Sequence, residues 1–156
     1  MDKTTALEKL NHSRQEVLRA IAGLSEDQLV EIPVEGIWTV RDLLAHIASW
    51  ERVCLEPLRA YAQGGLYIPE DIPDDLAWND RQALRWQALS LPAVLQDFTD
   101  TRRALLAELE KLDPQRWEQP IRMPWKEEGP LPNMLSGLAW HENEHAQSIR
   151  KLKAKS

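Results

Sequence analysis

The sequence predicts an all-α protein, a four-helix bundle with short extra helices in its connections. Three observations support this fold class. The ten prolines divide the 156 residues into long proline-free stretches. Apolar residues recur in these stretches at helical spacing, and no stretch shows the sustained alternation of apolar and polar residues that is typical of a β-strand. Because the length is that of one ordinary domain, we expect a single bundle domain over residues 1–156.

The first two long helices are predicted from their apolar stripes and their ends. The first has its stripe over residues 7–21 and ends at Gly23, after which a short helical turn follows. The second begins after Thr39, because Thr39 and the acidic Asp42 three positions later are close to a capping box. This second helix ends at Gly64.

The second half of the chain contains the other two long helices. An acidic loop with two prolines over 66–75 leads to a short helix near 76–88, and the third long helix occupies 91–112. A further connection leads to the fourth long helix at about 132–154. The connection before the third helix has about 26 residues. It is long enough to return along the bundle, because a helix of about 22 residues spans only ~33 Å.

Composition excludes several classes of function. The net charge is −6 and the pI is about 5.3, which argues against a protein that binds nucleic acid by neutralising phosphates. Charged residues interrupt every apolar stretch before the ~20 residues of a transmembrane helix, and the N-terminus lacks the apolar segment of a signal peptide. Cys54 is the single cysteine, so it cannot form an internal disulfide. We expect a cytoplasmic protein with no nucleic-acid or membrane partner.

Two of the four histidines occupy core positions of the fourth helix. His12 falls opposite the apolar stripe of the first helix, so we expect it on the surface. His141 and His145 lie within the stripe of the fourth helix, one turn apart. A buried imidazole needs partners for its nitrogens, and two adjacent ones disfavour each other's protonation. A shared divalent metal satisfies both, because histidines at i and i+4 project toward one point.

His46 is the candidate third ligand. It lies at the edge of the stripe of the second helix, where it can face the seam with a neighbouring helix. The sequence therefore predicts a metal site formed by His46, His141 and His145. Three neutral nitrogens leave at least one coordination position open for water or substrate, as in catalytic sites. The alternative is a set of core histidines that each bond to a neighbouring side chain or carbonyl.

The candidate ligands on the fourth helix also match the H-E-x-x-H signature of zinc peptidases over residues 141–145. A peptidase is nevertheless disfavoured. That class takes its third ligand downstream of the pair, where few residues follow here. It also needs a sheet to hold an extended peptide, and none is predicted.

Three other residues are candidates for the surroundings of the site, and no catalytic residue is predicted. Glu51 falls near the centre of an apolar stripe, where an unpaired carboxylate is costly. It either orients a metal-binding imidazole or pairs with Arg14 of the first helix. Trp50 and Trp140 lie near the histidines, either as pocket walls or as bulky core aromatics. Cys54 is interpreted as a buried structural thiol.

Two segments of the chain resemble the DinB/YfiT-like superfamily of small four-helix proteins. They are GIWTVRDLLAHIASWE (36–51) and HENEHAQSI (141–149). Members share a Trp-Ser/Thr helix start, one histidine on the second helix and an H-x-x-x-H pair on the fourth. Trp38 and Thr39, then His46, then His141 with His145, match these features. The segment AWNDRQAL (77–84) is also similar to the ClbS/DfsB branch.

The resemblance implies an up-down-down-up bundle, often a homodimer, in which three histidines hold a divalent metal, commonly zinc or nickel. Characterised relatives are transferases and isomerases that use bacillithiol, mycothiol or glutathione. The function implied is that of a metal-dependent enzyme, a thiol S-transferase or a hydrolase, which acts on a small electrophile. The alternative is a non-catalytic bundle that binds and sequesters a small molecule or a metal.

Overall fold

A computed structural model, which describes residues 1–155, has the expected four-helix bundle. The four long helices are α1 (Lys3–Ile21), α3 (Val40–Ala62), α5 (Leu91–Glu110) and α7 (Leu131–Lys155). Short helices in the connections are α2 (Glu26–Val30), α4 (Asp75–Trp86) and α6 (Pro114–Glu118). The expected capping box of α3 is present, because Thr39 and Asp42 each accept a hydrogen bond from the other's backbone N–H. Within residues 1–155, no helix has both the length and the apolar character needed to span a bilayer.

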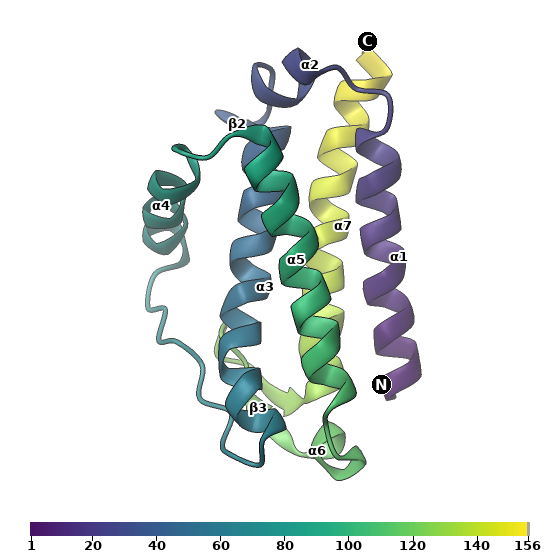
Figure 1. The fold of residues 1–156 in the computed structure, drawn as a ribbon, viewed down its shortest axis with the longest axis vertical. Helices are drawn as coiled ribbons and strands as arrows, with labels where there is room; N and C mark the ends of the chain where they lie inside the picture. The colour runs from purple at the N-terminus through teal and green to yellow at the C-terminus, as the bar shows by residue number, and fades with distance from the viewer. Residues whose placement is uncertain (156) are drawn as a thin grey trace.

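The long helices run up, down, down and up, as the resemblance implies. Figure 1 shows α1 and α7 pointing in one direction and α3 and α5 pointing in the other. The bundle packs chiefly as two parallel pairs, α1 with α7 and α3 with α5. The connection over residues 63–90 returns along the length of the bundle and carries α4 outside α3 (Figure 1). This return lets two consecutive long helices point the same way.

Two short hairpins correct the expectation that the chain has no strands. Strand β1 (Pro33–Glu35) pairs with β2 (Trp38–Thr39), and β3 (Pro120–Arg122) pairs with β4 (Glu128–Pro130), both antiparallel. Strands of two or three residues are too short to show the alternation that marks a strand in a sequence. The first hairpin leads directly into α3.

One charged side chain from each long helix meets in the middle of the bundle. They are Arg14 of α1, Glu51 of α3, Arg102 of α5 and Glu142 of α7, none more than 9% exposed. Arg14 donates hydrogen bonds to Glu51 at 2.7 Å and to Glu142 at 2.9 Å. Arg102 donates to Glu51 at 2.5 Å and to Glu142 at 3.2 Å. The four groups form a closed ring of ion pairs, so each buried charge has two opposite partners.

Candidate metal centre

The three histidines predicted as ligands come together between α3 and α7. Nε2 of His141 lies 2.9 Å from Nε2 of His46 and 3.0 Å from Nε2 of His145. The candidate ligand atoms of the three side chains all lie within 4.8 Å of one another. His12 is exposed on α1, as expected, and takes no part in the cluster.

The chemistry of this cluster fits a cation. A nitrogen of a neutral imidazole is either a donor or an acceptor. Nε2 of His141 can therefore form a good hydrogen bond with only one of its two neighbours. Burial, and next the neighbouring imidazoles, lower the pKa of His46 to about 2 and that of His141 to about 3, so both are neutral at pH 7. Neutral imidazole nitrogens that face one point are typical ligands of zinc and nickel.

Glu35 is a residue of the site that the sequence did not reveal. Its Oε2 lies 2.5 Å from Nδ1 of His145 and accepts a hydrogen bond from it. This bond places the proton of a neutral His145 on Nδ1 and leaves the lone pair of Nε2 facing the other two histidines. A carboxylate behind the ring is the usual partner of a metal-binding histidine. No local pattern marks Glu35, because it lies in the short strand β1 and is 110 positions from His145.

His46 is oriented by packing. Its ring lies 4.9 Å from the ring of Trp38 and 6.2 Å from that of Trp86, measured between centroids. Its Nδ1 is buried and has no hydrogen-bond partner among residues 1–155. Because no hydrogen bond to Nδ1 fixes this ring, its contacts with the two indoles orient it. The other nitrogen, Nε2, faces the cluster.

The two buried glutamates near the histidines belong to the ion-pair ring. Glu51 bonds to Arg14, one of its two expected alternatives, and also to Arg102. Glu142, the glutamate of the H-E-x-x-H match, accepts hydrogen bonds from Ser13 at 2.6 Å and from both arginines. Its carboxylate is occupied by these bonds and is not placed as the general base of a zinc peptidase. This arrangement agrees with the argument against that class.

The histidine cluster borders a cavity of about 490 Å³. The lining residues are His46, Trp50, Asp75, Asn79, Trp125, Glu127, Asn133, Gly137, Leu138, Trp140 and His141. Trp50 and Trp140 are therefore both pocket walls. Trp50 is also a core aromatic, whereas Trp140 is 66% exposed and the alternative of a core position does not hold for it. Cys54 lies outside this lining, fully buried, and burial raises the pKa of its thiol, which fits a structural role.

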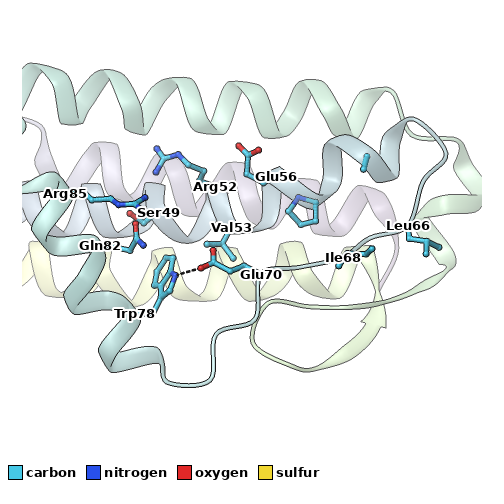
Figure 2. Close-up of a pocket in the computed structure, with 12 residues that line it drawn as sticks. Ser49, Arg52, Val53, Glu56, Leu66, Ile68, Glu70, Trp78, Gln82 and Arg85 are labelled. Carbon is cyan, nitrogen blue, oxygen red and sulfur yellow. Dashed lines mark hydrogen bonds between the residues drawn. The ribbon is translucent and has the colours of Figure 1, made fainter.

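A second cavity, of about 570 Å³, lies along α3 and contains none of the histidines. Figure 2 shows Arg52 and Arg85 toward one end of this cavity and Leu66 and Ile68 toward the other. Trp78, which lines it, packs against Trp50 with 4.7 Å between ring centroids. Since Trp50 lines the histidine cavity, this pair of indoles lies between the two spaces. The second cavity is therefore separate from the candidate metal centre.

The sequence model of the DinB superfamily matches residues 9–149. The chain belongs to the DinB superfamily. No curated protein matches the sequence. This assignment agrees with the family that residues 36–51 and 141–149 resemble.

Solved structures show the same fold. A mycothiol-dependent maleylpyruvate isomerase aligns with a TM-score of 0.80 and 13% identity over 96% of this chain, which spans only 61% of the isomerase. YfiT from Bacillus subtilis, described as a probable metal-dependent hydrolase, has a TM-score of 0.72 and 20% identity, with 99% of this chain and 89% of YfiT covered. DfsB, a sibling lethal factor precursor, has a TM-score of 0.79 and 18% identity, with 99% and 96% covered.

Proposed function

We propose that this member of the DinB superfamily is a metal-dependent enzyme that acts on a small electrophile, by thiol S-transfer or by hydrolysis. His46, His141 and His145 would hold one divalent ion, zinc or nickel. The observation that carries the proposal is a cluster of three imidazole nitrogens beside a cavity, with no fourth protein ligand in the cluster among residues 1–155. Such a donor set leaves a position open, whereas structural zinc sites are closed by four protein ligands.

The surrounding residues support catalysis at this open position. A bound divalent ion would supply Lewis acidity, which lowers the pKa of a thiol or water that coordinates it. Glu35 holds His145 through Nδ1, and Trp38 packs against His46, so two of the three rings are oriented before any ligand arrives. The cavity of about 490 Å³ lies in the size range of small-molecule sites.

A low-molecular-weight thiol, namely bacillithiol, mycothiol or glutathione, is the proposed cosubstrate of the transferase form. The resemblance and the fold shared with a mycothiol-dependent isomerase support this part of the proposal. We place the enzyme in the cytoplasm as a homodimer, with small molecules as its partners.

Metal content tests the ligand set. Wild type, His12→Ala and His141→Ala are purified identically, incubated with zinc or nickel, desalted and examined by elemental analysis. We expect one ion per chain in wild type and in His12→Ala, and none in His141→Ala. A wild type without metal, or full retention in His141→Ala, would contradict the site.

Turnover tests the reaction class. The metal-loaded protein is incubated with a generic electrophile, with each of the three thiols in turn and without any thiol, and the loss of the electrophile is measured. Consumption that depends on a thiol and is lost in His141→Ala supports S-transfer, and consumption without a thiol supports hydrolysis. A loaded protein that binds the electrophile and leaves it unchanged would favour the sequestering bundle instead.

A further inference from the structure

We propose that the side chains of this cavity wall, considered apart from any ion that the histidines hold, favour an organic ammonium group next to an aromatic or apolar part over an anionic group of similar shape. That the substrate carries such a group rests on the proposed function. The binding preference of the cavity rests only on the residues of its wall, so it can be tested in protein without metal.

Every full charge on the cavity wall is negative. Asp75 and Glu127 line the cavity, and within residues 1–155 neither side chain has an ion pair or a hydrogen bond. No lysine or arginine belongs to the lining. Lys126 lines a neighbouring hollow together with Asp74 and with Asp75, which therefore borders both spaces. In the metal-free protein, a cation in the cavity is attracted by two carboxylates of the lining, whereas an anion is repelled by both and is attracted by no basic residue of the lining.

Three indoles provide the apolar part of the wall, and indole faces also attract cations. Trp50, Trp125 and Trp140 all line the cavity. Trp is the aromatic side chain that binds an ammonium group best through its ring face. The Nε1 of Trp50 donates to Oδ1 of Asn79 at 3.0 Å, which fixes that ring in place. Trp140 is 66% exposed, so much of its surface is free to contact a ligand.

Gly137 explains how the third indole reaches the cavity. A Cβ atom at this position would lie 2.7 Å from Cζ2 of Trp125, which is too close for any side chain. The glycine therefore lets the ring of Trp125 lie directly against α7. A glycine inside a helix lowers helix stability. A glycine is nevertheless required here for Trp125 to lie this close to α7 in the cavity wall.

Three probes of similar shape and different charge test the proposal. They are 2-phenylethylammonium, 2-phenylethanol and phenylacetate, titrated into metal-free protein at pH 7.5 so that no metal can coordinate them. The indole N–H signals in NMR spectra report binding. We expect the ammonium to bind about five- to tenfold more tightly than the alcohol, and phenylacetate to bind more weakly than the alcohol. The preference should shrink as salt is added, because both carboxylates are exposed.

Two double variants separate the cavity from the net charge of the protein. Asp75→Asn with Glu127→Gln should reduce the ammonium preference to about two- to threefold. Asp80→Asn with Glu128→Gln makes the same change in charge on the same segments but outside the lining, and should retain the full preference. A third variant, Trp140→Leu, should weaken the ammonium more than the alcohol. The proposal is overturned if phenylacetate binds as tightly as the ammonium, or if both double variants lose the preference equally.

This test and the metal analysis can fail independently. If the protein prefers the ammonium probe but never retains metal, the inference about the cavity is supported and the proposed metal-dependent function is contradicted. Metal binding and turnover with no preference among the three probes would uphold the enzyme and overturn this inference.

Discussion

The imidazoles of the candidate metal centre are oriented by different means. His145 is held by a hydrogen bond from its Nδ1 to the carboxylate of Glu35, whereas His46 is held by contact with Trp38 and Trp86. A hydrogen-bonded carboxylate also raises the basicity of the ring nitrogen that binds a metal. We therefore expect Glu35 to affect metal affinity although it is not itself a ligand.

Replacing Glu35 tests this role. Glu35→Gln should weaken zinc or nickel binding by about 10–100-fold, because the neutral amide supports the imidazole less well. The measurement is competition with a chelator of known affinity, with circular dichroism to confirm the fold. Glu31→Gln is the matched control, since Glu31 lies nearby on the same connection and is exposed. Equal affinities of the two variants would show that Glu35 has no role in holding the metal.

The buried histidines also make the stability of the metal-free protein depend on pH. Burial lowers the pKa of His46 to about 2 and that of His141 to about 3, whereas both titrate near ~6.5 in an unfolded chain. Between these values the unfolded state binds more protons, so the free energy of unfolding falls as the pH drops. The expected slope is about 1.4 kcal/mol per pH unit for each histidine below pH ~6.5.

Urea unfolding between pH 7.5 and 5 measures this slope. We expect His141→Gln to reduce it relative to wild type, because one buried imidazole is removed. His12→Ala should keep the wild-type slope, since His12 is exposed. A wild-type stability that does not fall over this range would contradict the lowered pKa values of His46 and His141.

The four long helices are joined by the buried ring of ion pairs as well as by apolar packing. Each helix contributes one charge, and each charge bonds to partners on two other helices. Glu142 directly follows His141 on α7. The ring therefore constrains the rotation of α7 about its axis, and with it the direction in which the two histidines of this helix point.

Breaking the ring should cost a large part of the stability of the bundle. Glu51→Ala leaves Arg14 and Arg102 buried with one carboxylate between them, and we expect a loss of about 3–5 kcal/mol in the free energy of unfolding. Glu56→Ala, an exposed position on the same helix, should change it by less than about 0.5 kcal/mol. Chemical denaturation measures both, and similar small losses would show that the ring contributes little.

In the whole molecule, the metal centre connects segments that are far apart in the chain. His46 lies on α3, His141 and His145 on α7, and Glu35 on the hairpin before α3. A ligand that binds only when these segments are assembled stabilises the folded state by mass action. Metal binding should therefore raise the melting temperature.

Thermal unfolding with and without metal tests this linkage. At a free metal concentration of about 100 times the Kd, stabilisation of ~2.7 kcal/mol corresponds to a rise of roughly 5–10 °C for a domain of this size. His12→Ala should show the same rise as wild type, and His141→Ala should show none. A rise in His141→Ala equal to that of wild type would place the metal elsewhere.

The helices and the histidine trio could be predicted from the sequence because both depend on local patterns. Apolar spacing, caps such as Thr39, and the positions of proline and glycine act within a few residues, so they define where each helix begins and ends. The same spacing placed His141 and His145 on the core face of one helix and His46 at the edge of another. Their meeting then required only that these two helices be neighbours.

Contacts between distant segments had to come from the tertiary structure. The length of the connection over 63–90 permits α3 and α5 to run parallel, but only packing decides that they do. Glu35 bonds to His145 from a hairpin whose strands are too short to be recognised in the sequence. Glu51 bonds to Arg102 as well as to Arg14 because their helices are adjacent in the bundle. Side chains on different elements meet according to how the helices are arranged in space, and spacing along the chain does not encode that arrangement.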